Sequence, residues 1–333
     1  MARDRQSILQ WPCTQDLPTN DNRFITLPDG RSVTYAEYGT PGGFPVLFFH
    51  GAPSSRLEPL MLGGDAFGAL GLHVIAPDRP GMGGSTYQPG RRFADYPQDV
   101  VDFAEAMELN RFAVLGNSGG CPYVLACAAS IPERVHAAVV VSGAARMDWP
   151  EAAENLPRQL RLFWTIARRA PFLLPAFLLV MVKALDTASP ERTLSQQKKT
   201  MPPSDYAVLS QPGHQEAFVA TLKASMAQGT RGATWELRLH VDDWGLGLDR
   251  IGIPLHFFHG DQDPQAPLPA LRRLVSSLPT ARLVVYPGDA HLSTFANHID
   301  EIAAALTGGT TNHADHASAK DSGSIQAVSD ALP

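Results

Sequence analysis

The stretch GNSGG, residues 116–120, stands between two apolar runs, RFAVLG (111–116) and CPYVLACAAS (121–130). The first run predicts a buried β-strand and the second an apolar helix. The three glycines allow the backbone to turn sharply and to approach neighbouring chains closely. A strand-to-helix turn of the pattern G-x-S-x-G can expose a serine hydroxyl at the end of a strand. Two interpretations follow: a nucleophile at Ser118, or a packing turn that only contains a serine.

Similar apolar runs recur along the chain, and most of them end in a polar loop. They are PVLFFHG (45–51), LHVIAPDRPGMGGS (72–85), RVHAAVVVSGA (134–144), PLHFFHGDQD (254–263) and RLVVYPGDAH (282–291). A hairpin is predicted at 23–39, and helices are predicted at 59–70 and 99–109. Strands without polar alternation, separated by helices, predict an α/β fold with a mostly parallel, doubly wound sheet.

The strand rhythm stops near residue 146 and resumes near residue 254. We therefore divide the core into residues 23–145 and 251–307, with a helical cap insertion at 146–250. Residues 1–22 are expected to form a flexible arm. The small, polar tail at 308–333 has the composition of a disordered segment, and its two histidines suit a solvated tail better than a metal site.

Composition excludes several classes of protein. Of 333 residues, 44% are hydrophobic, so a sizeable core is expected. The net charge of −6 argues against nucleic acid as a partner. Three cysteines do not suggest a disulfide framework and fit a reducing, cytoplasmic compartment. The N-terminus lacks the apolar segment of a secretory signal, and no apolar run reaches the roughly 20 residues that span a bilayer. The oligomeric state is not indicated.

A serine nucleophile needs a base and a group that orients the base. Loops beyond the strand C-termini are where open α/β sheets place such residues. Asp263 follows one predicted strand and His291 follows the next, which gives the order Ser118, Asp263, His291. Asp261 is the alternative acid. His259 and His298 are competing histidines, with structural roles preferred for both.

These motifs resemble the α/β-hydrolase fold superfamily over residues 23–306, specifically its capped esterase and C–C-hydrolase types. Besides the GNSGG turn, the resemblance rests on FFHGAPSS, APDRPGMGGS, HGDQDPQAP and GDAH. It implies that Ser118 is the nucleophile, His291 the general base and Asp263 its orienting acid. It also implies an oxyanion hole formed by the backbone N–H groups of Gly119 and Ala52. The implied supporting residues are His50, Gly51, Gly116, Asn117 and Gly120.

The serine at position 118 limits the chemistry. By resemblance, epoxide hydrolases and haloalkane dehalogenases carry an aspartate there, so both are rejected. The sequence then predicts a cofactor-free, metal-free serine hydrolase that acts on a medium-sized, largely apolar carbonyl compound such as an ester or lactone. The alternatives are a C–C bond hydrolase, lyase, acyltransferase or cyclisation enzyme, and a ligand-binding protein on a hydrolase scaffold.

The stretch RLFWTIARRAPFLLPAFLLVMVKAL (161–185) is the most apolar part of the insertion. Three interpretations remain open for it: an apolar roof over the substrate pocket, two helices packed on each other, or a segment at a membrane surface. Basic residues flank its apolar centre, which allows a weak association with an anionic membrane surface. The same charges are also typical of a solvated helix face.

Overall fold

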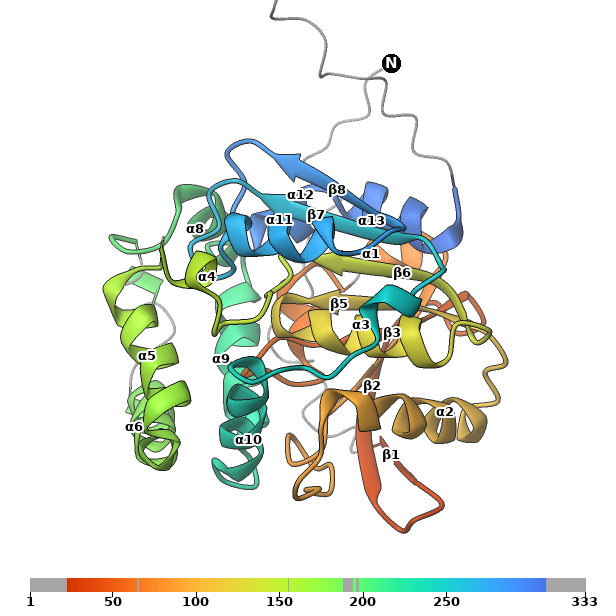
Figure 1. Ribbon diagram of the computed structural model, residues 1–333, viewed down its shortest axis with the longest axis horizontal. Coiled ribbons are helices and arrows are strands. Elements are labelled where there is room, and N and C mark those ends of the chain that lie inside the picture. The colour runs from red at the N-terminus through yellow and green to blue at the C-terminus, as the bar shows by residue number, and fades with distance from the viewer. Residues whose placement is uncertain (1–22, 65, 155, 188–193, 196–197, 310–333) are drawn as a thin grey trace, which may run out of the picture.

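The computed structural model describes residues 23–309 except 65, 155, 188–193 and 196–197 (Figure 1). The expected arm at 1–22 and all of the expected tail beyond residue 309 lie outside the described residues.

One eight-stranded sheet forms the centre of the molecule, with the order β1-β2-β4-β3-β5-β6-β7-β8 (Figure 1). β2 pairs antiparallel with both β1 and β4, and every other pair of neighbours is parallel. The predicted hairpin and the predicted mostly parallel α/β sheet are therefore confirmed. The strands are β1 Arg23–Thr26, β2 Ser32–Gly39, β3 Phe44–Phe49, β4 Leu72–Pro77, β5 Phe112–Asn117, β6 Val135–Val141, β7 Leu255–Gly260 and β8 Ala281–Tyr286.

The α-helices fall into two groups, one that flanks the sheet and one that lies between β6 and β7 in the chain. The first group is α1 Ala66–Ala69, α2 Tyr96–Ala106, α3 Cys121–Ser130, α11 Leu268–Ser276, α12 Ser293–Asn297 and α13 Ile299–Thr307. The second group is α4 Pro150–Glu154, α5 Arg158–Arg169, α6 Leu174–Thr187, α8 Pro203–Leu209, α9 His214–Ser225 and α10 Arg231–His240. The 3-10 helices are η3 Glu58–Met61, η4 Phe93–Asp95, η5 Ser118–Gly120, η6 Pro171–Leu173 and η7 Leu248–Arg250.

Alternate residues of the central strands enter two separate cores. In β3, Leu47 and Phe49 pack on one side with side chains of α2, α3 and α11. Val46 and Phe48 pack on the other side with side chains of α1, α12 and α13. These four side chains of β3 are fully buried. A strand that is covered on both faces reads as a continuous apolar run, which explains the absence of polar alternation.

The helix predicted at 59–70 is wrong as a continuous element. The chain forms η3 and then only the short α1, because Gly63 adopts a left-handed conformation with φ of 93° between them. The helices between β6 and β7, here called the helical insertion, gather at one side of the sheet (Figure 1). They are α4, α5, α6, α8, α9 and α10.

Candidate active site

Ser118 occupies a strained turn between β5 and α3. Its φ of 51° lies in the left-handed region, which costs a non-glycine residue roughly 1–2 kcal/mol. The glycine at 120 is needed because a Cβ there would collide with the carbonyl oxygen of Phe49 at the end of β3. A packing turn would explain this glycine. It would not explain a serine at the strained position, where glycine would be favoured.

Asp263 and His291 meet beyond the ends of β7 and β8. Nδ1 of His291 lies 2.8 Å from Oδ2 of Asp263. Oδ1 of Asp263 accepts two backbone N–H groups of its own loop, at 2.8 and 3.0 Å. The alternative acid, Asp261, is exposed, and its Oδ1 accepts a backbone N–H of the loop after β8 at 2.8 Å. Of the two aspartates, the structure brings Asp263 to the histidine.

The contact keeps Asp263 ionised and makes the His291 imidazole more basic. Burial favours the neutral form of Asp263, but the charge of His291 and the hydrogen bond to it keep the pKa of Asp263 below its usual value. Burial also acts to lower the pKa of His291, yet the Asp263 carboxylate outweighs this effect and raises it. A carboxylate at Nδ1 selects the tautomer whose Nε2 can accept a proton.

The loop after β6 connects the serine and histidine loops. Ser142 donates its hydroxyl to the carbonyl oxygen of His291 at 2.7 Å. The N–H of Ala144 donates to the carbonyl oxygen of Ser118 at 2.9 Å. Among the hydrogen bonds of the described residues, none joins the Ser118 hydroxyl to the His291 ring. Such bonds are often long without substrate and shorten in the substrate complex.

The backbones of Gly119 and Ala52 meet beside the serine. A Cβ on Gly119 would lie 2.9 Å from the backbone nitrogen of Ala52. A Cβ on the neighbouring Gly51 would lie 3.4 Å from Cβ of Ser118. Two backbone N–H groups close to a nucleophile are the arrangement that stabilises an oxyanion.

Arg79 and His50 hold the loop that carries Ala52. The buried Arg79 guanidinium donates to the carbonyl oxygens of His50 and Gly51, at 2.6 Å for the latter. The His50 ring accepts the N–H of Arg79 at 3.3 Å and donates to the Gly51 carbonyl at 2.9 Å. Burial and the charge of Arg79 lower the pKa of His50. His50 is thus a neutral residue that shapes this loop.

Glu58 lies at the site although no sequence motif pointed to it. Its buried carboxyl accepts the N–H of Gly51 and the side-chain amide of Asn117, both at 2.6 Å. Burial raises the pKa of Glu58. The side chain therefore connects the loop before Ala52 to the strand end that carries Ser118. The only sequence signal was an acid inside the mainly apolar stretch LEPLML (57–62).

Two helices of the insertion bind loops of the site through buried polar side chains. Asp205 of α8 accepts three successive backbone N–H groups, those of residues 291–293, at 3.1, 2.8 and 2.9 Å. Thr221 of α9 is buried, and its hydroxyl lies 3.2 and 2.9 Å from those of Ser54 and Ser55, just after Ala52. Sequence patterns indicated neither Asp205 nor Thr221.

A third helix of the insertion, α10, contributes Glu236 to a buried cluster of charged side chains next to the site. Glu236 is fully buried and pairs with Arg79 at 3.0 Å and with Arg91. It also accepts the Tyr123 hydroxyl at 2.6 Å. Burial opposes its ionisation, but the two arginines hold the pKa of Glu236 well below its usual value. The insertion is thereby linked to the same arginine that holds the loop of Ala52.

His240, one helical turn after Glu236, lies where Gly119 and Ala52 meet. A Cβ on Gly119 would lie 3.2 Å from Nε2 of His240. The imidazole is fully buried, and neither of its nitrogens has a hydrogen-bond partner among the described residues. The Glu236 carboxylate is 3.7 Å from Nε2, beyond hydrogen-bond distance. Buried polar groups nearly always have a partner, so this histidine suits contact with a ligand.

The surroundings of His240 are aromatic. Its ring centroid lies 5.3 Å from that of Phe93 and 6.2 Å from that of Trp164. Phe93 comes from η4 and Trp164 from α5, so the core and the helical insertion both contribute to this environment. A ligand that reached His240 would therefore meet apolar ring surfaces.

The competing residues take other positions. His259 bonds the carbonyl of Ala266 at 2.9 Å and lies 3.8 Å from Asp263, so it supports the loop of the acid. His298 pairs with Asp289 at 2.7 Å. Cys121 and Cys127 are free and fully buried, and burial raises the pKa of both thiols.

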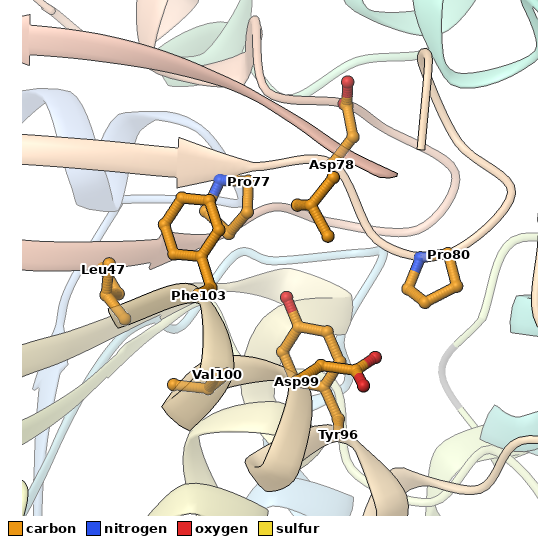
Figure 2. Close-up of a pocket in the computed structure, with 9 residues that line it drawn as sticks. Leu47, Pro77, Asp78, Pro80, Tyr96, Asp99, Val100 and Phe103 are labelled. Carbon is orange, nitrogen blue, oxygen red and sulfur yellow. The ribbon is translucent and has the colours of Figure 1, made fainter. Parts of the chain in front are cut away.

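A small cavity between the end of β4 and α2 is separate from these residues (Figure 2). Its two carboxylates are already bound, Asp78 by Arg56 and Asp99 by Arg31. The lining residues are Val33, Leu47, Pro77, Asp78, Pro80, Tyr96, Asp99, Val100 and Phe103.

Metal ligation and membrane crossing each require a recognisable arrangement of residues. The described residues contain no group of three or more potential ligand side chains that could hold a metal ion. No single described helix is long and apolar enough to cross a membrane, although the bent pair Arg158–Arg169 and Pro171–Leu185 has the required length and composition. The chain bends by 112° between the two helices of this pair. The histidines of the tail, His313 and His316, lie outside the described residues.

Known proteins share the fold over most of this chain. The model of the α/β hydrolase fold family matches residues 45–297. A 2-hydroxymuconate semialdehyde hydrolase of Pseudomonas putida is 28% identical over 79% of this chain and 87% of its own length. A non-heme chloroperoxidase of Streptomyces lividans is 37% identical, but the match covers only 35% of this chain and 43% of that protein.

Solved structures show the same fold. A hydrolase from Pseudomonas aeruginosa PA01 superposes with a TM-score of 0.61 at 21% identity, covering 87% of this chain and all of that one. The enol-lactonase of Burkholderia xenovorans LB400 gives a TM-score of 0.58 at 18% identity, covering 86% and 98%. At such identities the likeness concerns the fold alone.

Proposed function

The chain belongs to the α/β-hydrolase fold family, and we propose that it is a serine hydrolase that cleaves a carbonyl substrate through an acyl-enzyme. The observation that carries the proposal is the buried contact of 2.8 Å between His291 and Asp263, on loops that are joined to that of a strained Ser118. A strained serine and a carboxylate-bound imidazole are the two parts of nucleophilic catalysis that packing alone does not require.

In the proposed mechanism, Ser118 attacks the substrate carbonyl while Nε2 of His291 takes its proton. The oxygen of the tetrahedral intermediate accepts the N–H groups of Gly119 and Ala52. His291 then returns the proton to the leaving group, and an acyl-enzyme remains. Water, deprotonated by the same histidine, releases the acid. Asp263 stabilises the imidazolium that forms twice in this cycle.

The substrate proposed is medium-sized and largely apolar. The apolar centre of the stretch 161–185, residues 171–182, does not support this choice, because Phe172, Phe177 and Val180 are exposed to solvent. The support comes instead from the aromatic rings of Phe93 and Trp164 around His240. We propose that His240 binds an oxygen of the substrate beside the scissile carbonyl.

The primary test is the intact mass of the protein after exposure to a fluorophosphonate probe. We expect one adduct on the wild type and on Ser210→Ala, a control at an exposed serine, and none on Ser118→Ala. An unlabelled but folded wild type would reject the nucleophile and leave the ligand-binding alternative, to be pursued by thermal-shift screening.

His240 has its own test. The change His240→Phe keeps an aromatic ring but removes both nitrogens. We expect kcat/KM to fall about 10-fold or more for esters with an oxygen on the α-carbon, as for loss of a buried hydrogen bond. Unsubstituted esters of the same length should change much less. An equal loss for both substrate sets would contradict the assignment.

C–C bond hydrolysis is the second candidate, favoured by the match to the Pseudomonas putida hydrolase over most of both chains. It uses the same residues, so only substrates distinguish it. Turnover of a vinylogous diketone without turnover of esters would select this alternative. Acyl transfer would appear as a new ester when an alcohol acceptor is added.

The buried, unpaired thiols of Cys121 and Cys127 support the proposal of a cytoplasmic location.

A further inference from the structure

Exposed apolar side chains are concentrated in one part of the helical insertion. Seven large hydrophobic side chains are exposed in the described part of the chain, and six of them lie between residues 162 and 180. Phe172 is 77% exposed and Val180 is 68% exposed. We call α5, η6 and the part of α6 up to Leu185 the outer hairpin. The six residues are Leu162, Phe172, Leu173, Phe177, Leu179 and Val180.

Three of these side chains form a row along α6. Leu173 stands directly before the helix, and Phe177 and Val180 follow it at spacings of four and three residues. This spacing places side chains on the same side of a helix. Leu174 and Leu178, also four residues apart, lie on a different side and are fully buried. The exposed row is therefore an apolar ridge on a helix that is anchored from its other side.

The outer face of α5 is basic. Arg158, Arg161, Arg168 and Arg169 are exposed there, and Lys183 is exposed on α6. Residues 158–185 contain no aspartate or glutamate. In the described residues, no ion pair joins Arg158, Arg168 or Arg169 to a carboxylate. A local cluster of positive charge thus stands on a chain whose net charge is −6.

The outer hairpin is also the part of the insertion farthest from the sheet. α9 and α10 lie between it and the core in Figure 1. Both α5 and α6 contact α10, the helix that carries His240. A partner surface that binds the outer hairpin would therefore contact the helical insertion and leave the core of the fold uncovered.

We propose that the outer hairpin binds an anionic lipid surface, with the ridge of α6 inserted among the headgroups and the arginines of α5 against the lipid phosphates. An apolar face flanked by basic residues is the arrangement of helices that lie in a membrane interface. A symmetric contact buries the same surface of both copies, so it would bring two of these basic clusters, with no acid between residues 158 and 185, into one interface. The charge pattern therefore selects an anionic surface over a second copy.

The test is co-sedimentation of the full chain with vesicles of phosphatidylcholine alone or mixed with phosphatidylglycerol. We expect binding to the mixed vesicles that weakens with salt. Phe172→Asp should reduce the bound-to-free ratio at least about 10-fold, since it places a charge beside the apolar ridge. Arg168→Gln and Arg169→Gln should each reduce it about fivefold, the effect expected for one basic residue near an anionic surface.

Phe24→Asp is the matched control, because Phe24 on β1 is 62% exposed and is the one large exposed hydrophobic residue outside the hairpin in the described chain. It should bind vesicles like the wild type. Equal losses for Phe24→Asp and Phe172→Asp, or no binding by the wild type at low salt, would overturn the proposal. Sedimentation velocity without lipid completes the test: a dimer that Phe172→Asp dissociates, with no vesicle binding, would assign the ridge to a second copy instead.

Discussion

The helical insertion contains two regions built on opposite principles. The inner helices α8, α9 and α10 bury the polar side chains Asp205, Thr221 and Glu236, and each of these contacts a residue at the candidate site. The outer hairpin instead exposes apolar side chains to solvent. These three buried polar side chains have partners inside the protein, whereas the exposed apolar side chains of the hairpin are available to a partner outside it.

The largest expected difference between the two regions concerns Glu236. Glu236→Ala leaves Arg79 and Arg91 buried without a counter-charge, so we expect the free energy of unfolding to fall by about 3–5 kcal/mol. Arg168→Ala on the outer hairpin should change it by less than about 0.5 kcal/mol. Urea denaturation of both variants measures the loss of unfolding free energy. Similar losses in Glu236→Ala and Arg168→Ala would contradict the distinction between the two regions.

A pair of substitutions within α6 makes the same contrast on a single helix. Leu178 is fully buried and Val180 is mostly exposed. Leu178→Ala should cost about 2–5 kcal/mol of unfolding free energy, because it opens a cavity. Val180→Ala should cost less than about 0.5 kcal/mol. If Val180→Ala proved as costly as Leu178→Ala, the ridge would be packed in solution and the outer surface would not be free.

Thr221 tests the contact between α9 and the loop after Ala52. Thr221→Val keeps the shape but leaves the hydroxyls of Ser54 and Ser55 without this partner. We expect a loss of about 1–3 kcal/mol in unfolding free energy, together with a fall in kcat. Thr165→Val, at an exposed position of α5, is the control. An unchanged stability of Thr221→Val would show that these serines find other partners.

The smallest expected effect is a shift in pH dependence. Burial acts to lower the pKa of His291, but the charge and hydrogen bond of Asp263, together with the charges of Asp205 and Glu58, raise it above its usual value. The base must be neutral to act, so kcat/KM should rise as pH increases through this pKa. Asp205→Asn removes one of these three negative charges, so the acidic limb should move to lower pH, by less than about one unit.

The control for this shift is the same change at an exposed aspartate, Asp249→Asn in η7. It should leave the acidic limb of the pH profile in place. A shift to higher pH in Asp205→Asn, or an equal shift in both variants, would contradict the assigned geometry.

Much of the fold was predictable because it follows from local patterns. The continuous apolar runs predicted the parallel strands, and the GNSGG turn predicted a sharp strand-to-helix junction at Ser118. The helix expected at 59–70 failed for a local reason as well, since the left-handed Gly63 interrupts it. The residues of the proposed triad could also be identified from local sequence, because each of them follows the end of a predicted strand.

The amino-acid sequence was therefore sufficient to predict the sheet and to identify the candidate residues at its edge. Only the folded chain shows which acid meets His291 and brings Glu58, Asp205 and His240 to the site. Asp205 and His291 are 86 residues apart, and no periodicity along the chain reports such a contact. A strand or a turn depends on neighbouring residues, whereas a buried polar contact depends on how distant segments pack, since each buried group must find its partner there.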